Sequence, residues 1–396
     1  MPRHSVIVPG FSFSGIPAGI KKSGALDLAL IFSEKPATTA GSFTTNKIKA
    51  APVKLSMKQI SAHQGQAIII NSGNANACTG NGGYKNAQGM ARMTAKALGI
   101  SSSLVYVSST GVIGRPLPIE KIRKAIPHLT GKLSPFDLDK VASSIMTTDT
   151  FAKIYSKKIR IGTNTGTMAG IAKGAGMICP NMATMLCFIM TDIAITPHAL
   201  TSALGDAVKE SFNRISIDND MSTNDTVMIM ANGLLKNKPL SKNSPFFKAF
   251  TDGLCDLTHK LSKMIVTDGE GATKFIEITI TGARTETDAE IIARSVANSM
   301  LVKTAIYGRD PNWGRIIAAV GYSGIQVIEK KIDIYLNRIK LVNKGTGTGK
   351  ESIATHQLAR KNISILIDLG LGRKSAKALT CDMTEKYVQI NAHYTT

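Results

Sequence analysis

The chain has 396 residues, with 48 Lys and Arg against 27 Asp and Glu, so its formal net charge is +21. This length predicts two or three domains of roughly 100–200 residues each, and 43% hydrophobic against 19% charged residues exclude a mostly disordered chain. Five single cysteines without a CxxC pair exclude a disulfide framework and a zinc ribbon, and they indicate a reducing compartment.

Strand-like and helical patterns alternate along the chain. The expected strands, in chain order, are 66–71, 104–108, 167–171, 185–195, 226–231, 275–281, 332–341, 363–369 and 387–391. The expected helices, where apolar residues recur three and four apart, are 86–98, 119–127, 138–146, 197–212, 244–264 and 288–302. Several strands are continuous apolar runs, which is typical of strands covered on both faces. The alternation predicts a layered α/β protein.

A polar stretch at 281–288 divides the chain into a larger core, 1–280, and a smaller domain, 281–396. No apolar run reaches the ~20 residues that a membrane-spanning helix needs. The first residues carry prolines and glycines instead of the apolar stretch of a secretory signal. We therefore expect a cytoplasmic protein without a membrane partner.

The positive charge is concentrated in the first part of the chain. Residues 1–183 hold 22 Lys and Arg against 6 Asp and Glu, which is +16, whereas residues 184–396 hold 26 against 21, which is +5. A basic chain suggests a nucleic-acid-binding protein. The basic residues are dispersed, however, and with 5% aromatic residues few rings can stack on bases. A nucleic-acid-binding protein therefore stays as an alternative function, but the leading expectation is that the protein has no nucleic-acid partner.

Four polar, glycine-rich segments lie directly beside apolar strands: 71–80, 108–114, 173–186 and 267–274. Glycine lets the main chain approach a ligand closely, and binding residues tend to lie on loops held by a rigid scaffold. Each segment alone is more typical of a tight turn, but together they predict the rim of one site. The seven histidines are isolated and form no HExxH motif, so we expect no metal.

Thr184 stands where one of these segments becomes the apolar run that starts at Met185. A hydroxyl at this point can attack the carbonyl of Ala183 in an N-to-O acyl shift, and hydrolysis of the ester then leaves Thr184 as a new N-terminus. Its free α-amine, with an ordinary pKa of about 7.7–8.0, can act as the base for its own hydroxyl. Most Ala-Thr pairs before a strand do nothing of this kind, so the residues alone leave cleavage open.

The segment 173–186, with its Pro-Asn-Met-Ala-Thr-Met-Leu, resembles the self-cleavage signature of the ornithine acetyltransferases of arginine biosynthesis. These enzymes are glutamate N-acetyltransferases, and some are also amino-acid acetyltransferases. The resemblance extends over nearly the whole chain, in order through the segments 71–80, 109–114, 146–150, 211–214, 222–226, 266–274, 310–315 and 394–396.

The resemblance implies a layered α-β-β-α sandwich core with a smaller C-terminal α+β domain. It also implies that the chain cuts itself between Ala183 and Thr184 into an α chain, 1–183, and a β chain, 184–396, which stay together as an α2β2 heterotetramer. Thr184 would accept acetyl from N2-acetylornithine, release ornithine and pass acetyl to glutamate, which gives N-acetylglutamate. No cofactor is implied, and acetyl-CoA as a second acetyl donor stays open.

The same resemblance implies roles for individual residues. Thr110 and Gly111 match the pair that stabilises the oxyanion of acyl transfer. The implied substrate contacts are Thr147, Lys173, Thr184, Glu270, Asn391 and Thr396. A lysine can pair with a substrate α-carboxylate and a glutamate with the ornithine ammonium, but without the resemblance a surface lysine and a turn glutamate would be the simpler interpretation.

Three residues depart from the family pattern. Asn219 and Met221 stand where glycine and threonine are expected, and His393 stands where an acidic residue is expected. The nearer functional alternative is a self-cleaving amidase or aminopeptidase of similar fold, which would pass its acyl group to water.

Overall fold

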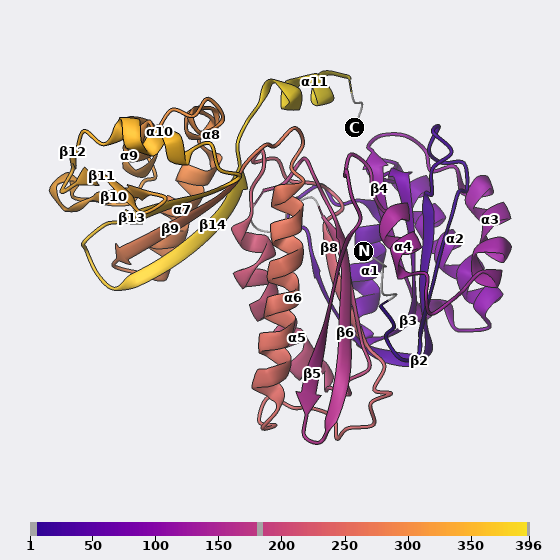
Figure 1. Ribbon diagram of the computed structural model, residues 1–396. Coiled ribbons are helices and arrows are strands. Elements are labelled where there is room, and N and C mark those ends of the chain that lie inside the picture. Colours follow the sequence, from indigo (N-terminus) through magenta and orange to yellow (C-terminus); the bar gives the residue numbers. More distant parts are fainter. Residues whose placement is uncertain (1–5, 180–184, 394–396) are drawn as a thin grey trace.

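The computed structural model describes residues 6–179 and 185–393, which form a large core and a smaller C-terminal domain beside it (Figure 1). The strands of the core are β1 (Phe11–Ile16), β2 (Leu28–Phe43), β3 (Gln64–Asn74), β4 (Val105–Val112), β5 (Lys153–Ile161), β6 (Asn164–Lys173), β7 (Leu186–Thr191) and β8 (Thr226–Ala231). Its helices are α1 (Ala51–Gln59), α2 (Gly80–Leu98), α3 (Ile119–Gly131), α4 (Leu138–Ser144), α5 (Pro197–Glu210) and α6 (Phe247–Thr267). The C-terminal part contains β9 (Phe275–Ala283), α7 (Glu286–Asn298), α8 (Met300–Tyr307), α9 (Trp313–Gly321), β10 (Asp333–Leu336), β11 (Ile339–Asn343), β12 (Thr346–Gly347), α10 (Glu351–Gln357), β13 (Asn362–Asp368), β14 (Lys374–Cys381) and α11 (Glu385–His393).

One long strand, β2, joins the two halves of the core sheet, whose strand order is β4-β3-β2-β8-β7-β6-β5 with β1 also paired to β2. The first half of β2 pairs with β1 and β3, and its second half pairs with β8. The register with β3 shifts between Phe32 and Ala37, around the exposed residues 34–36. The shift lets one continuous strand belong to both layers of the core.

Apolar side chains fill the space between the two sheet halves. Phe13 and Ile31 from one half meet Phe188 and Met228 from the other. On the outer faces, α2 and α3 cover the first half, and α5 and α6 cover the second, on opposite sides of the core in Figure 1. Every residue of β7 and β8 is buried, which explains their continuous apolar runs. The expected α-β-β-α sandwich is confirmed.

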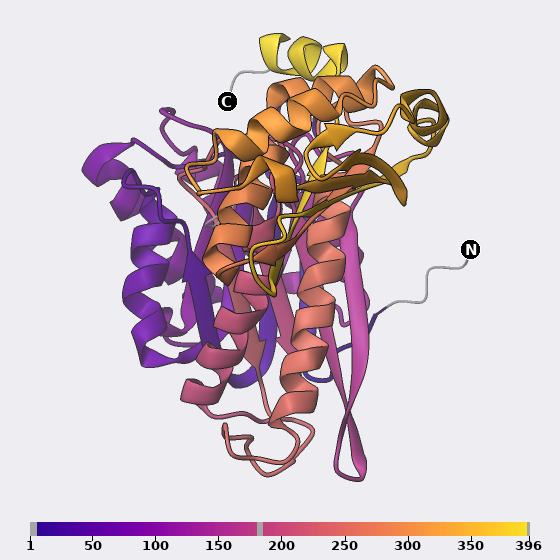
Figure 2. The same cartoon turned by 90° about the vertical axis from the view of Figure 1, so that its left-hand side faces the viewer.

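The C-terminal domain is built on a second, six-stranded sheet with the order β12-β11-β10-β13-β9-β14. Apolar residues of α7 and α9, including Ile292 and Ile316, form one buried cluster with the apolar residues of this sheet. The domain is the orange to yellow part of the ribbon in Figure 2. β9 runs parallel to β13 and antiparallel to β14. The sheet therefore begins at Phe275, and the boundary expected between residues 280 and 281 falls inside a strand.

Three of the expected elements have a different structure, and the sequence patterns predict no element where β1, β2, β5, β12, β14, α1, α9 and α10 lie. Residues 387–391 belong to α11 and not to a strand. No residue of this helix is buried, so the segment is not packed into a sheet as the expected strand would be. The run 332–341 is a hairpin of β10 and β11, with Asn337 and Arg338 at positive φ in its turn. The helix expected at 288–302 is divided because Ser299 is extended and its hydroxyl accepts the Val302 N–H at the start of α8.

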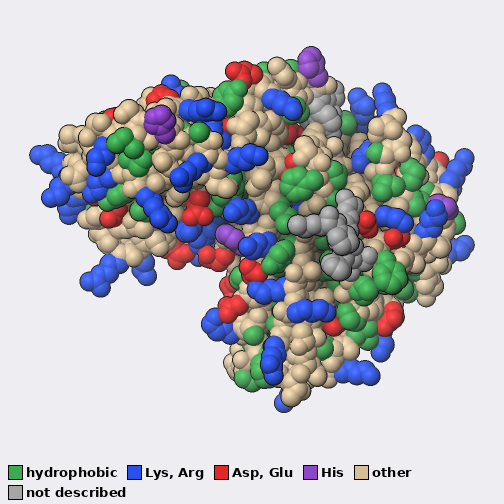
Figure 3. Space-filling view, viewed as in Figure 1, with side chains coloured by type: hydrophobic (Ala, Val, Ile, Leu, Met, Phe, Trp, Pro, Cys, Tyr) green, Lys and Arg blue, Asp and Glu red, His purple; other side chains and the backbone are tan. Residues whose placement is uncertain are grey.

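The surface does not gather its positive charge into one patch on the face in Figure 3, where Lys and Arg side chains are scattered over both the core and the C-terminal domain. Within residues 6–179 and 185–393, no helix has the length and apolar character required to span a bilayer.

Candidate active site

One pocket lies at the end of the core where β4 and β6 stop and where α11 crosses above them (Figure 1). It is lined by the described residues that the family resemblance implies, namely Thr110, Gly111, Thr147, Lys173, Glu270 and Asn391. Ala183, Thr184 and Thr396 lie outside the described residues. The four glycine-rich segments therefore meet at one site, together with the loops that contain 147–148 and 218–224 and with α11.

The parallel pair β3 and β4 brings Thr110 and Gly111, the expected oxyanion pair, to the pocket. Gly73 of β3 is paired with Gly111 of β4. Gly111 has φ +127°, and a Cβ added to it would lie 2.4 Å from the backbone carbon of Gly73. A side chain is therefore excluded at Gly111 by both conformation and space. Thr110, directly before it, is 6% exposed at the pocket wall.

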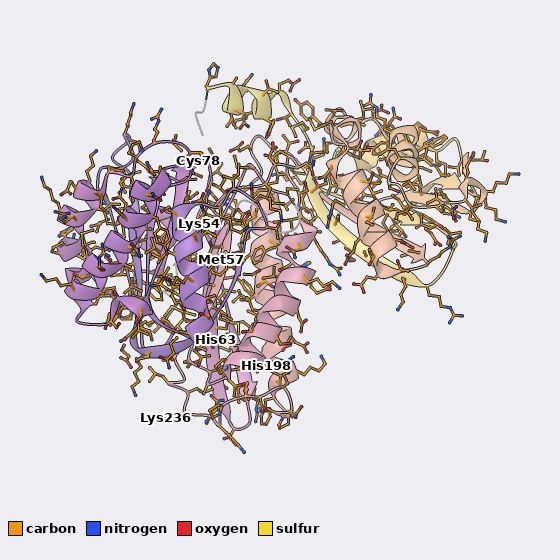
Figure 4. The ribbon with its side chains drawn as sticks, turned by 180° about the vertical axis from the view of Figure 1, so that it is seen from behind. Lys54, Met57, His63, Cys78, His198 and Lys236 are labelled. Carbon is orange, nitrogen blue, oxygen red and sulfur yellow. The ribbon has the colours of Figure 1, made fainter. Side chains whose placement is uncertain are left out.

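Asn224 joins these loops to the segment that precedes β8. Its Nδ2 donates to the carbonyl oxygens of Ala75 at 2.7 Å and Ser109 at 2.8 Å. Seen from behind (Figure 4), Cys78 of the same 71–80 loop lies above α1, beyond Lys54. The loop is thus at the α11 end of the core, and a buried amide fixes its position beside the pocket.

Lys173, the last residue of β6, supplies a buried cation. Its side chain is 5% exposed, and its Nζ donates to the Thr147 hydroxyl at 2.7 Å and lies 3.8 Å from Asp149 Oδ2. Burial lowers the pKa of Lys173, and the negative charge of Asp149 opposes that shift. Lys173 is also the cross-strand partner of Leu186 in β7. The cation therefore lies beside the strand that begins two residues after Thr184.

Asp149 and Lys153 form a buried charge network behind Lys173. Lys153 is 0% exposed and its Nζ contacts Asp149 at 2.7 Å and Asp268 at 2.5 Å. Burial alone would raise the pKa of Asp149, but the charges of Lys173 and Lys153 and the hydrogen bonds from Lys153 and Gly174 hold it well below its usual range. Asp149 lies in the 146–150 segment that carries the resemblance, yet nothing in that motif identifies Lys153 or Asp268 as its partners.

Glu270 places a carboxylate on the same pocket. It is 9% exposed, and its Oε2 accepts a hydrogen bond from Asn391 Nδ2 of α11 at 2.8 Å. The hydroxyl of Tyr387, also on α11, donates to Asp218 Oδ2 at 3.2 Å. Two side chains thus connect α11 to the pocket wall, although none of its residues is buried.

One family departure has a direct structural explanation. Asn219 has φ +67°, a left-handed conformation that glycine adopts freely and that asparagine tolerates better than most residues. Its Oδ1 also accepts a hydrogen bond from Asn298 Nδ2 at 2.7 Å. Asparagine therefore replaces the expected glycine without a change of backbone. Nothing in the structure explains Met221 or His393.

No group of three or more His, Cys, Asp or Glu side chains within the described ranges is arranged to hold a metal ion. The pocket instead presents a lysine, a glutamate, two aspartates, hydroxyls and two amides. Together with the α-β-β-α core, these groups define a layered α/β protein with a pocket of mixed charge at one end of its core.

Comparisons with known proteins identify the family. The ArgJ family model matches residues 12–396. The arginine biosynthesis bifunctional protein ArgJ of Geobacter sulfurreducens is 49% identical over 391 residues, which cover 98% of this chain and 100% of that protein. The protein of the same name from Syntrophotalea carbinolica is 50% identical over 393 residues, 99% of this chain and 100% of that one. A crystal structure of the ArgJ protein from Bacillus halodurans matches with a TM-score of 0.51 and 44% identity over 52% of this chain and 98% of that chain. The chain belongs to the ArgJ family, an enzyme family of arginine biosynthesis.

Proposed function

We propose that this chain is a self-cleaving acetyltransferase that moves acetyl from N2-acetylornithine to glutamate through an acetyl-threonine intermediate at Thr184. The observation that carries the proposal is the shared pocket of Lys173, Glu270, Thr110 and Gly111, at the end of the sheet where Lys173 pairs with Leu186. Thr184 lies outside the described residues, and in the sequence it precedes Leu186 by two positions.

The two charged groups match the two ends of an ornithine derivative. The buried ammonium of Lys173 suits an α-carboxylate, and the carboxylate of Glu270 suits a side-chain ammonium, since charge-assisted hydrogen bonds are the stronger kind. Thr147 and Asn391 orient these two groups through hydrogen bonds of 2.7 and 2.8 Å. Thr396 completes the proposed substrate contacts from outside the described residues.

Acyl transfer follows a ping-pong order. The free α-amine of Thr184 takes the proton from its own hydroxyl, whose oxygen attacks the acetyl carbonyl. Thr110 and Gly111 stabilise the resulting oxyanion, and ornithine leaves as the amine. Glutamate then attacks the acetyl-threonine ester and leaves as N-acetylglutamate. Acetyl-CoA is the candidate second donor, because the relatives are named bifunctional.

Self-cleavage produces the free amine that this mechanism needs. The mature protein would consist of residues 1–183 and 184–396, which we propose assemble as an α2β2 heterotetramer. The Bacillus halodurans chain supports separate chains, since 98% of it covers only 52% of this sequence. No cofactor enters the cycle.

Intact-mass measurement of the denatured wild-type protein tests the proposal. We expect two fragments, residues 1–183 and 184–396, and no full-length chain. Incubation with N2-acetylornithine should then give acetylglutamate only when glutamate is present. A chain that stays whole would contradict the cleavage, and release of acetate without acetylglutamate would favour the amidase alternative.

Gly176→Ala is expected to weaken binding of N2-acetylornithine through Glu270. A Cβ at residue 176 would lie 2.4 Å from Glu270 Oε2, so the carboxylate must move. Loss of a charge-assisted hydrogen bond costs about 1.5–3 kcal/mol, which corresponds to a KM raised about tenfold or more. Steady-state kinetics check this. Gly205→Ala is the control, because nothing lies within 4 Å of its added Cβ; equal KM values for the two variants would contradict the role of Glu270.

A further inference from the structure

A buried carboxylate that the reaction scheme does not use holds the peptide that follows Thr184. The N–H of Met185 donates to Asp225 Oδ1 at 3.1 Å, and the Met185 carbonyl accepts the N–H of Thr226 at 3.1 Å. Met185 itself is 1% exposed. Its nitrogen is bonded to the carbonyl carbon of Thr184, and consecutive Cα atoms are about 3.8 Å apart. The peptide group that Asp225 holds by this hydrogen bond is therefore the one directly after Thr184 in the chain.

The same loop also holds the chain before the cleavage segment. The two carboxylate oxygens of Asp218 accept the N–H groups of Met177 at 2.6 Å and Ile178 at 2.8 Å. The loop 218–225 thus contacts the chain on both sides of residues 180–184. Two carboxylates seven positions apart accept backbone N–H groups at both flanks of the expected cut.

The environment of Asp225 is unfavourable for a group that serves packing alone. It is 1% exposed, and its Oδ2 has no hydrogen-bond partner in the part of the chain that the structure describes. Burial raises the pKa of Asp225 well above its ordinary value, against the hydrogen bond from Met185, the nearby Thr44 side chain and the charge of Lys173. The Thr44 hydroxyl itself donates to the carbonyl oxygen of Ser222. A buried acceptor without a partner destabilises a fold and calls for an explanation.

We propose that Asp225 is a positioning residue for self-cleavage, which holds the Met185 amide and so sets the place from which the Thr184 hydroxyl attacks Ala183. The inference rests on the proposed self-cleavage. In the first step a bond forms between the Thr184 oxygen and the Ala183 carbonyl carbon, the C–N bond breaks, and the hydroxyl proton moves to the released nitrogen. Water then hydrolyses the ester, which gives the carboxylate of Ala183 and restores the Thr184 hydroxyl. The first step needs no co-reactant, so its rate depends on how the two groups are held together.

The test is the cleavage rate of full-length chains made by cell-free translation, followed by intact mass over time. Asp225→Ala is expected to cleave about 10²-fold more slowly than wild type, the loss that a misplacement of about 1 Å causes in an oriented reaction. Asp225→Asn keeps an acceptor oxygen for the Met185 N–H and is expected to cleave close to the wild-type rate. Wild-type cleavage by Asp225→Asn would show that residue 225 acts through its hydrogen bond to the Met185 N–H and not through a negative charge.

Asp192→Ala is the matched control. Asp192 is also buried, at 3% exposed, and its Oδ1 accepts the Thr167 N–H at 2.7 Å just beyond the other end of β7. Burial raises the pKa of Asp192 as well. The control removes a comparable buried carboxylate at a distance from the cut, and its cleavage rate is expected to equal that of wild type.

Two outcomes would overturn the inference: Asp225→Ala cleaving as fast as Asp192→Ala, or Asp225→Asn cleaving as slowly as Asp225→Ala. A melting curve of each uncut chain reports whether it is folded, and if Asp225→Ala does not fold, Asp225→Ser replaces it with a shorter polar side chain. A wild-type chain that never cleaves would overturn the proposed function instead, so the two failures are distinguishable.

Discussion

Thr184→Ala is expected to leave one uncut polypeptide of 396 residues and to abolish acetyl transfer. Alanine has no hydroxyl to attack the Ala183 carbonyl, and without cleavage residue 184 has no free α-amine. Both the nucleophile and its base are lost through one change. Intact mass and an acetylglutamate assay measure the two effects on the same sample.

Thr184→Ser is the matched control for this variant, because serine retains the hydroxyl and only the methyl group is lost. It is expected to cleave and to transfer acetyl, more slowly than wild type. The comparison is informative because both variants leave the pocket residues Lys173 and Glu270 in place. Cleavage of Thr184→Ala at the same bond would contradict the threonine nucleophile.

Lys153→Met is expected to lower the free energy of unfolding by about 3–5 kcal/mol, the range for removal of one partner from a buried ion pair. Lys153 is 0% exposed and lies between two carboxylates, Asp149 and Asp268. Asp268 also accepts hydrogen bonds from the Thr150 amide at 3.0 Å and from its hydroxyl. Without the ammonium, two buried negative charges lose their closest shared partner.

Urea denaturation in the uncut Thr184→Ala background measures this loss, because a single chain avoids dissociation of fragments during unfolding. Lys157→Met is the control. Its Nζ lies 2.7 Å from Asp256, but both side chains are more than a third exposed, and exposed ion pairs contribute about 0–1 kcal/mol. Equal losses for the two variants would show that the buried network does not stabilise the fold.

The charge of +21 has no single structural cause. Most Lys and Arg side chains visible in Figure 3 are dispersed, whereas Lys153, Lys173, Lys274 and Lys303 are buried and bonded internally. Lys274, for example, donates to the carbonyl oxygens of Ile306 and Tyr307. Part of the positive composition therefore belongs to the fold and to the pocket, which a count along the chain cannot distinguish.

The sequence by itself determined the layered α/β core, and its glycine-rich segments contribute residues to one pocket. β7 and β8 are buried at every position because both faces are covered, and apart from Thr191 and Thr226 all their residues are apolar, which is a direct pattern in the sequence. The glycine-rich segments at the strand ends likewise mark places where backbones approach closely, as Gly111 does to Gly73. Burial and backbone conformation restrict which residue can stand at each position, so they can be predicted from the local sequence.

Only the tertiary structure decided which distant groups meet. β2 breaks its apolar run at exposed residues 34–36 and still joins both sheet layers, and α11 has no buried face that could identify it as a helix. The side chains of Lys153 and Asp268, which are 115 positions apart in the sequence, form a hydrogen bond. Asp225 accepts a hydrogen bond from the Met185 N–H, 40 positions away. No periodicity encodes such pairs, because a charged side chain carries no local mark of its partner. Which residues pair follows from the packing that brings the loops to one end of the sheet.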